Sequence, residues 1–540
     1  AEAAAAGGRS DPKPRAMRSR WARGSFLKDG DALMEEALRV SYPGFAREPL
    51  QGKGLHEEMR DALHALLQEG YFHYDCVQYG ARVNVTRVQR VLVGEPGITY
   101  LYQKLRLFAL PWDDASVARG ALVSIAKLNE QVKRQARKML AQKGAEGGHV
   151  AASAGVGSCD FNLTLINAAL TNKHAPPEEG VAGNRKTKKL KGATAADEES
   201  ENRGPPRQPV LPFKPDTKFD APIDLAVNWH RDSTLEPFST IGVYHHTPDS
   251  SARDWEIAMC CDAGDLAPPL RTKLSDGECY FMLGNFNHHH QHAVIAGTSA
   301  RYASTHRVAL TQDATFDGIM ERCAEVLCGK RFTRSASPES LEAARARAVG
   351  ELAARLEFDW IRQFYCQGAV HAAQHSTWWA PRIDQLTEKW TELDTELRTM
   401  AEVASQQQVP LKALRMLIYL FESRLKGREE WEARLRDPTY KRIPAAYRPI
   451  RRPDCSTEGA FTAGMDGLLA ALQARLAVRT NSKAAKVAKD TNVTKAAKAT
   501  KATDITNSAK AAKGAKVAHA TTAAKASRVG KAMKARANRS

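Results

Sequence analysis

The spacing of apolar residues changes along the chain, and the change marks two kinds of structure. Between Asp114 and Ala145 apolar residues recur every three or four positions, which predicts a long amphipathic helix. From Ile223 to about Thr311 the pattern becomes short β-branched and aromatic runs separated by turns. These runs are IDLAVNW, STIGVYHH, WEIAMCC, GECYFML, HAVIAG and RYASTHRVAL. Many short strands at regular spacing predict a sandwich or jelly roll.

A helical region follows the strands, from Glu339 to about Val478. Its segments EFDWIRQFYCQG, DQLTEKWTELDTEL and LKALRMLIYLFESRL again carry apolar residues at helical spacing. We therefore expect an α+β protein, in which a jelly roll with flanking helices precedes a separate all-α domain. With 540 residues and 43% hydrophobic content the chain can bury a sizeable core. No stretch approaches the ~18 apolar residues of a membrane span.

The basic charge is concentrated at the C-terminus. The chain has a formal net charge of +18, but residues 480–540 hold 12 Lys and 3 Arg against Asp490 and Asp504, a net charge of +13. This Lys/Ala-rich tail has almost no large apolar side chains, so we expect it to be disordered when free. Two interpretations stay open: an arm that neutralises nucleic-acid phosphates as a linker histone does, or a solubilising extension of low complexity.

Other segments also have a biased composition. Residues 1–24 are small and basic without an apolar core, which predicts a disordered N-terminus. Residues 172–209 contain NRKTKKLKG followed by ADEESENRGPP, which indicates an exposed, disordered insertion. Its KTKKLK run resembles a nuclear-import signal and predicts a nuclear protein, with the cytoplasm as a second location. The nine cysteines lack a CxxC pair, as is typical of a reducing compartment.

The first candidate for chemistry lies where the run IDLAVNW ends, at His230-Arg231-Asp232. At positions i and i+2 of an extended backbone, an imidazole and a carboxylate can project to the same side. Completed by a distant histidine, these two ligands form the facial triad of non-haem Fe(II) oxygenases. For so short a motif, the alternative is a salt bridge at the surface.

Further residues of the same kind follow in chain order. Four histidines occupy five positions about sixty residues later, at another strand boundary: His288, His289, His290 and His292. Arg301 and Arg307 come next, and an arginine can hold a carboxylate through two parallel hydrogen bonds. Tyr280 in GECYFML and Asn162 in CDFNLTLIN can donate additional hydrogen bonds.

The segments around these residues resemble the FTO family of AlkB-type Fe(II)/2-oxoglutarate dioxygenases. The resemblance rests on VNWHRDSTLEPFSTIGVYHH, GECYFMLGNFNHHHQHAVIAG and RYASTHRVA, and upstream on RVLVGEPGITYLYQKLRLFALPW. It continues through EFDWIRQFYCQG and TWWAPRIDQL, and so spans about Ser25 to Val478. It implies a dioxygenase domain over residues 25–325, a helical C-terminal domain over residues 339–478, and a tail over residues 479–540.

The resemblance also implies an iron site. In the family the distal iron ligand is the last histidine of an H-Q-H, nine residues before the arginine that binds the dicarboxylate. His292 meets both conditions, so the implied ligands are His230, Asp232 and His292. His290 is the alternative, because strand alternation would place it and His288 on the same face as His292.

For the cosubstrate 2-oxoglutarate, the resemblance implies that Arg301 and Tyr280 hold the distal carboxylate. Arg307 and Asn162 would hold the end that binds the iron. A serine that contributes to this site in the family is Ala303 here. The loss of one neutral hydrogen bond weakens binding by about 0.5–1.5 kcal/mol, so activity is not excluded.

A nucleobase pocket is implied as well. Arg90 would hydrogen-bond the base and Tyr102 would stack on it, while the opposite wall would consist of Val227, Asn228 and Trp229. Two positions depart from the family: Gln103 stands where the family has a stacking leucine, and Ser233 stands where it has a glutamate. Ser233 keeps its backbone N–H as a donor but offers no carboxylate.

These features imply oxidative removal of methyl groups from N-methylated nucleobases, first of all N6-methyladenine in RNA. The reaction would use Fe(II), 2-oxoglutarate and O2, release formaldehyde and succinate, and act on single-stranded or flipped bases, since a stacked base cannot reach the metal. The partners would be single-stranded RNA or DNA, with the tail on the phosphate backbone, and no membrane. Two alternatives stay open: a 2-oxoglutarate oxygenase acting on a protein, and a catalytically inactive protein that binds nucleic acid or chromatin.

Overall fold

The computed structural model describes residues 26–79, 82–102, 104–145, 159–170, 214–216, 223–249, 254–261, 268–329, 338–442, 444–451 and 464–482, together with residues 491 and 494. The predictions for residues 1–24 and 172–209 therefore lie outside the described residues. The same holds for the Lys/Ala-rich tail, apart from residues 480–482, 491 and 494, which are helical. The chain divides into two units, residues 1–469 and residues 470–540, and the first contains all the elements described below.

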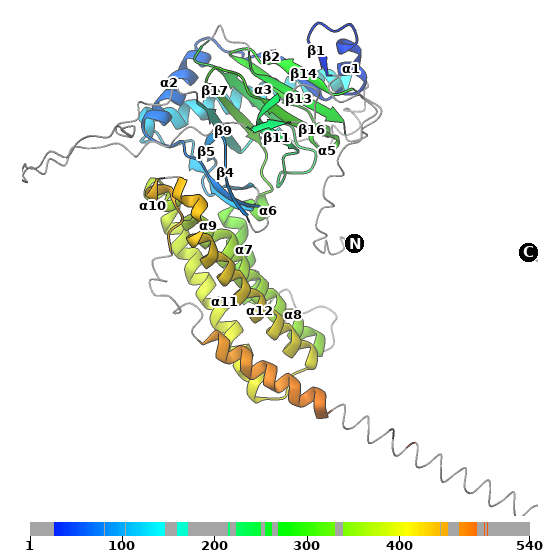
Figure 1. The fold of residues 1–540 in the computed structure, drawn as a ribbon, viewed down its shortest axis with the longest axis vertical. Coiled ribbons are helices and arrows are strands. Elements are labelled where there is room, and N and C mark those ends of the chain that lie inside the picture. The colour runs from blue at the N-terminus through cyan, green and yellow to red at the C-terminus, as the bar shows by residue number, and fades with distance from the viewer. Residues whose placement is uncertain are drawn as a thin grey trace, which may run out of the picture. The chain divides into compact units, whose positions relative to one another are not determined.

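Two large sheets form the first part of this unit (Figure 1). The six-stranded sheet has, in spatial order, β1 (Leu27–Lys28), β14 (Leu270–Lys273), β13 (Glu256–Cys261), β16 (His290–Ile295), β11 (Ile223–His230) and β10 (Lys214–Asp216). The seven-stranded sheet has β2 (Phe45–Pro49), β15 (Glu278–Met282), β12 (Ile241–His246), β17 (Arg301–Arg307), β9 (Leu163–Ala169), β5 (Gln89–Gly94) and β8 (Leu110–Pro111). The six runs expected to be strands are confirmed as β11, β12, β13, β15, β16 and β17.

The facing sides of the two sheets enclose a buried core. Ile241 and Val243 of β12 lie in one cluster with Ile257 and Met259 of β13. These residues alternate along their strands with residues that point the other way, as expected for a sandwich of two sheets. Two short hairpins form separate two-stranded sheets: β3 (Cys76–Tyr79) with β4 (Arg82–Val85), and β6 (Thr99–Tyr102) with β7 (Leu105–Phe108).

Helices α2 (Leu55–Gln68) and α3 (Ala121–Ala145) cover the other face of the seven-stranded sheet. A Cβ atom at Gly242 would lie 2.5 Å from Val132 Cγ1, so the glycine allows β12 and α3 to approach closely. Helix α1 (Met34–Val40) adds Met34 and Ala37 to the core between the sheets.

The long helix was predicted from Asp114 but begins at Ala121. Asp114 Oδ1 accepts a hydrogen bond from the Ser116 backbone N–H, and such local side-chain bonds compete with helix formation. Ala118 and Arg119 then take positive φ angles of 43° and 56° in a short 3-10 turn, η1 (Ala118–Gly120). The prediction of the helix start was therefore wrong by about two turns.

The second part of the unit is helical. Helices α8, α11 and α12 run side by side, and α7 lies against α8 and α11 (Figure 1). Helix α5 (Phe286–His289) belongs to the first part, where it lies between β15 and β16. After β17 the elements are α6 (Thr311–Ala314), α7 (Phe316–Leu327), α8 (Pro338–Arg355), the π-helical η3 (Leu356–Ile361), α9 (Arg362–Cys366), α10 (Gly368–Gln374), α11 (Ala380–Gln406), α12 (Leu411–Arg436), η4 (Pro438–Arg442) and η5 (Ala445–Tyr447). In the described ranges, no helix combines the length and apolar character needed to cross a membrane.

Hairpin β6–β7 joins the sheets to the helices through buried polar contacts. Arg106 Nε donates to the Asp359 carbonyl oxygen at 2.7 Å, and its guanidinium lies 4.1 Å from the Trp360 ring centroid. In the other direction, Gln367 Nε2 donates to the Arg106 carbonyl oxygen at 3.0 Å, and Trp379 Nε1 donates to the Ala109 carbonyl oxygen at 2.7 Å. Each part therefore satisfies backbone groups of the other.

Candidate active site

Strands β11 and β16 bring three candidate metal ligands together. His230 pairs directly with His292 in the sheet, and Asp232 follows two residues after His230. The ligand atoms of His230, Asp232 and His292 lie within 4.8 Å of one another, and His230 Nε2 is 3.5 Å from Asp232 Oδ1. His230 Nδ1 donates to the Asn228 carbonyl oxygen at 2.8 Å, which leaves the Nε2 lone pair for a metal.

Within the metal trio (His230, Asp232 and His292), the electrostatics keep Asp232 and His292 in the protonation states that a cation requires. Burial lowers the pKa of His292 to about 3, so its imidazole is neutral near pH 7. Burial alone would raise the pKa of Asp232, but the Arg307 guanidinium holds that pKa well below its usual range. His292 Nδ1 is also buried without a hydrogen-bond partner. A neutral imidazole and a carboxylate are the forms that bind metal, so the donor set fits Fe(II).

One residue that positions the trio was not predicted. Asn287 Oδ1 accepts from the Asp232 backbone N–H at 2.9 Å, and Asn287 Nδ2 donates to the Asp232 carbonyl oxygen at 2.9 Å. The amide thus mimics a strand partner for the residue that follows β11. Its place inside the histidine-rich run is the only signal that the sequence offers.

The other histidines of the run lie elsewhere. His288 and His289 belong to helix α5, so the expectation that strand alternation would place His288 on the face of His292 is wrong. His290 begins strand β16, but its ring nitrogens lie 3.0 and 2.9 Å from the backbone oxygens of Phe286 and Ser41. Both nitrogens of the alternative ligand are therefore engaged away from the trio.

A second group with a similar donor set consists of His56, His246 and Asp276. Its carboxylate accepts hydrogen bonds at both oxygens, from His56 Nε2 at 3.1 Å and from His246 Nδ1 at 2.9 Å. The Thr247 backbone N–H donates to the same carboxylate at 2.9 Å. Hydrogen bonding accounts for this cluster without an ion.

Strand β17 carries two buried arginines, Arg301 and Arg307, and Arg307 contacts the metal trio. Arg307 Nε donates to Asp232 Oδ2 at 2.8 Å, while its Nη1 is buried without a partner. Asn162 lies next to it: its backbone N–H donates to the Arg307 carbonyl oxygen at 3.1 Å, and its Oδ1 accepts from the Ala309 N–H. Arg307 can therefore hold Asp232 and a further acceptor at once.

Arg301 lies at the other end of β17, where its Nη2 is also buried without a partner. It hydrogen-bonds the Tyr280 side chain; burial raises the pKa of that phenol although Arg301 opposes the rise. Ala303 is buried in the same core cluster as Tyr280 and offers no polar group. Two buried cations with unused N–H donors on one strand, one of them in contact with the metal trio, fit a dicarboxylate that also binds the metal.

Two predicted nucleobase contacts lie on strand β5 (Arg90) and on hairpin β6–β7 (Tyr102), and the hairpin approaches the same site. The Arg307 guanidinium lies 5.2 Å from the Tyr100 ring centroid, and Thr234 Oγ1 donates to the Leu101 carbonyl oxygen at 3.2 Å. The next residue, Tyr102, carries the Arg90 guanidinium 4.0 Å from its ring centroid. Arg90 and Tyr102 are thus in contact with each other.

The remaining candidates line strand β11 and its end. Val227 packs against a buried cluster that contains Val88, Trp229 stacks on Phe26 with ring centroids 6.4 Å apart, and Asn228 is exposed. Ser233 is exposed beside Asp232, and Gln103 lies outside the described residues. Register shifts between Leu225 and Val227 and between Val227 and His230 interrupt the regular alternation of β11.

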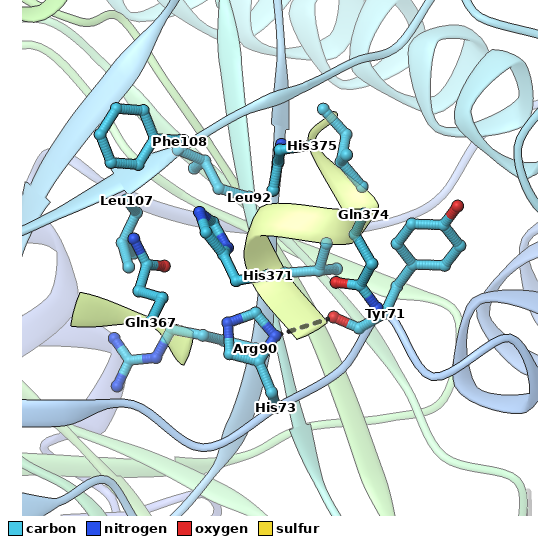
Figure 2. Close-up of a pocket in the computed structure, with 12 residues that line it drawn as sticks. Tyr71, His73, Arg90, Leu92, Leu107, Phe108, Gln367, His371, Gln374 and His375 are labelled. Atoms are coloured by element: carbon cyan, nitrogen blue, oxygen red, sulfur yellow. Dashed lines mark hydrogen bonds between the residues drawn. The ribbon is translucent and has the colours of Figure 1, made fainter. Parts of the chain in front are cut away.

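Arg90 also borders a small cavity of ≈10 Å³ where the sheets meet the helices (Figure 2). Asp75 links Arg90 to His73, another residue of the cavity, because its carboxylate lies 2.7 Å from Arg90 Nε and 3.5 Å from His73 Nε2. The His73 ring in turn meets His371 of α10 with centroids 6.0 Å apart. Arg90, the candidate contact to the nucleobase, is therefore held by a buried ion pair with Asp75. The contacts continue from Asp75 through His73 to His371 of the helical part.

Histidines at this cavity should make the fold sensitive to acid. Burial lowers the pKa of His375 to about 3, whereas the unfolded chain should titrate near 6.5. The unfolded state therefore binds a proton that the folded state excludes, so stability is complete above pH 6.5 and is lost as the pH falls towards 3. Below pH 6, each further drop of one pH unit should lower the free energy of unfolding by about 1.4 kcal/mol more in the parent than in His375→Phe. Urea unfolding at pH 7, 6 and 5 measures this, with exposed His64→Phe as control; parallel profiles for parent and His375→Phe would refute it.

Comparison with known proteins gives consistent matches over both parts. Residues 34–178 and 205–310 match the model of the FTO catalytic domain, and residues 314–474 match that of the FTO C-terminal domain. The chain is 25% identical over 424 residues to the alpha-ketoglutarate-dependent dioxygenase FTO of Xenopus laevis, covering 74% of this chain and 81% of the relative. A solved oxidoreductase of the 2OG-Fe(II) oxygenase family from Burkholderia pseudomallei is similar at 11% identity and a TM-score of 0.26, over 53% of this chain and 94% of that one.

Proposed function

The chain belongs to the FTO family and is a dioxygenase that depends on Fe(II), 2-oxoglutarate and O2, and from this premise we propose that it demethylates N-methylated nucleobases. The preferred substrate is N6-methyladenine in single-stranded RNA. The observation that carries this proposal is the Arg90–Tyr102 pair, in which a cation from strand β5 lies on an aromatic ring of the hairpin that reaches the metal trio. An aromatic face stacks on a base that has left its helix.

Each residue of the site has a defined task in this proposal. His230, Asp232 and His292 hold the iron, Arg307 and Asn162 hold the 2-oxo acid end of the cosubstrate, and Arg301 and Tyr280 hold its distal carboxylate. With 2-oxoglutarate and O2, bound iron supplies the oxidation that turns an N-methyl group into an N-hydroxymethyl group, which leaves as formaldehyde while succinate and CO2 form. The protein binds and orients the substrates and excludes water from the site. Asn287 holds the backbone of Asp232 in place, and Arg307 keeps the Asp232 carboxylate ionised.

A panel of single-stranded RNA and DNA oligonucleotides, each with one N-methylated base, tests this function through formaldehyde release. We expect release from N6-methyladenine RNA before the other members. A lysine-methylated, histone-like peptide belongs in the same panel. Release from the peptide alone would establish a protein substrate, and succinate production that stays at background with added Fe(II) would establish a protein without activity.

Arg90 should matter for the base and not for the cosubstrate. Arg90→Lys keeps a cation beside Asp75 but lacks the planar guanidinium, so the fold should survive while the contact to the base is lost. We expect demethylation of an N6-methyladenine oligonucleotide to fall about 10- to 100-fold, as for a lost charged hydrogen bond. Turnover of 2-oxoglutarate without nucleic acid should stay within a few-fold. Equal losses in the two assays would mean that Arg90 serves the fold.

The basic tail should act on long nucleic acid only. Removing residues 480–540 takes away +13 of the net charge of +18 and none of the residues of the site. Demethylation of a saturating short oligonucleotide should be unchanged, whereas the salt dependence of binding to a long single strand should flatten by about 0.7 in log–log slope for each phosphate no longer neutralised. Binding isotherms of both chains across a salt series give this slope, and superimposable slopes would leave the tail a solubilising extension.

The proposed place of action is the nucleus, in keeping with the KTKKLK run of residues 186–191.

A further inference from the structure

His245 lies in the core beside the residues proposed to hold the cosubstrate. It is fully buried on strand β12, in register with Ala303 of β17. Its neighbours in alternation, Ile241 and Val243, belong to the core cluster between the sheets that also contains Tyr280. His245 therefore projects into the same interior as Arg301 and Tyr280, whereas Tyr244 points to the opposite side, towards His56.

A hydrogen bond fixes the tautomer of this histidine. Arg301 Nε lies 3.0 Å from His245 Nδ1, and a guanidinium can only donate. His245 Nδ1 must therefore accept, which leaves the ring proton on Nε2. Burial, reinforced by the Arg301 charge, holds the pKa of His245 well below its usual range, so the ring carries one proton and not two.

The Nε2–H of His245 then has no acceptor among the residues that the structure describes. Arg301 Nη2 is likewise buried without a partner. The nearby carboxylate of Asp276 is occupied by His56, His246 and Thr247 on the other side of the strand. Two touching side chains thus keep unused donors in a dry interior, where each unmet donor is unfavourable by about 1–3 kcal/mol.

We propose that His245 is a third ligand of the distal carboxylate of 2-oxoglutarate, to which its Nε2–H donates a hydrogen bond beside Arg301 and Tyr280. This rests on the proposed role of Arg301 as the carboxylate anchor. A carboxylate accepts several hydrogen bonds at once and carries the charge that a buried guanidinium needs. His245 would then supply, from β12, a neutral donor at the position where Ala303 of β17 supplies none.

Two substitutions separate this role from a merely supporting one. The side-chain amide of asparagine overlays the Nδ1 position of histidine, so His245→Asn keeps an acceptor for Arg301 and removes the far donor. The amide of glutamine overlays Nε2, so His245→Gln keeps the far donor. Calorimetry with the full chain and Mn(II) in place of iron gives the Kd of 2-oxoglutarate without turnover. We expect His245→Asn to raise this Kd about 10- to 100-fold and His245→Gln to stay within about fivefold.

A ligand without the distal carboxylate tests which end of the cosubstrate is involved. 2-Oxopentanoate keeps the 2-oxo acid and the chain length but lacks the distal carboxylate, so His245→Asn should bind it as the parent does. Parent-like binding of 2-oxoglutarate by His245→Asn, or an equal loss for both acids, would overturn the proposal. So would weaker binding by His245→Gln than by His245→Asn, because His245 would then act only by supporting Arg301. Arg301→Ala tests the anchor separately: if it binds 2-oxoglutarate normally, the proposed function of Arg301 fails whatever His245 does.

Discussion

Alanine at His230, Asp232 or His292 should abolish 2-oxoglutarate turnover, with a loss of at least about 100-fold for each. Each side chain supplies one of three ligand atoms that lie within 4.8 Å of one another, and two remaining ligands cannot hold Fe(II) in an active geometry. Asp232→Ala should have the largest effect on the fold as well, because it leaves the buried Arg307 guanidinium without its carboxylate partner. Succinate formation at saturating Fe(II) measures the loss, and bound iron per chain shows whether it arises from the metal.

The same histidine-rich run offers matched controls. His288→Ala and His289→Ala remove exposed imidazoles of helix α5 and should leave turnover within a few-fold. His290→Ala removes a buried ring that stacks on Phe286, so it should lower thermal stability more than it lowers iron content. If His288→Ala lost iron while His292→Ala retained it, the assignment of the trio would be wrong.

Glu357→Ala should destabilise the helical part by about 3–5 kcal/mol, the range for breaking a buried ion pair. The Glu357 carboxylate is fully buried and lies 2.9 Å from Arg424 Nη2, 2.8 Å from Arg428 Nε and 3.5 Å from Arg362 Nε. Alanine would leave Arg428 and Arg362 without this buried carboxylate, whereas Arg424 keeps Asp394 at 2.6 Å. Urea unfolding at pH 7 measures the change.

Glu351 provides the comparison for Glu357, six residues earlier. Its ion pair with Arg347 spans 3.9 Å and both side chains are about 60% exposed. Glu351→Ala should therefore change the free energy of unfolding by no more than about 0.5 kcal/mol. Similar losses for the two substitutions would show that the Glu357 cluster contributes no more than a surface pair does.

Local patterns in the sequence were sufficient for the elements that carry the metal trio. Alternation predicts strands β11 and β16, so the H-x-D motif and the histidine-rich run could be placed at strand ends from the sequence. The choice of His292 within that run came from resemblance. The pattern failed where a side chain interrupts it: Asp114 delays the long helix, and α5 removes His288 from the strand. The roles of Arg301, Arg307 and Tyr280 came from resemblance, since no spacing defines a pocket.

Contacts between distant residues could not be predicted. Asn287 and Asp232 are 55 positions apart, and Arg301 and His245 are 56 positions apart. Both contacts depend on which segments of the chain become neighbours. For His245 and Arg301, on the paired strands β12 and β17, a register shift of one residue would turn either side chain to the opposite face. The pairing of Asp75 with Arg90 is of the same kind, because it depends on a bridge between His73 and Arg90.

The contacts of hairpin β6–β7 decide how far the catalytic part is a module that can be handled alone. A fragment ending before α8 would strip Arg106, which is 3% exposed, of its acceptor on Asp359 and of the Trp360 ring. The backbone oxygens of Arg106 and Ala109 would lose the donors of Gln367 and Trp379 at the same time. If such a fragment were inactive, the cause would be the polar groups near Tyr102 that have lost their hydrogen-bond partners, and not a catalytic role of the helices. We therefore expect full activity only from a chain that contains both domains.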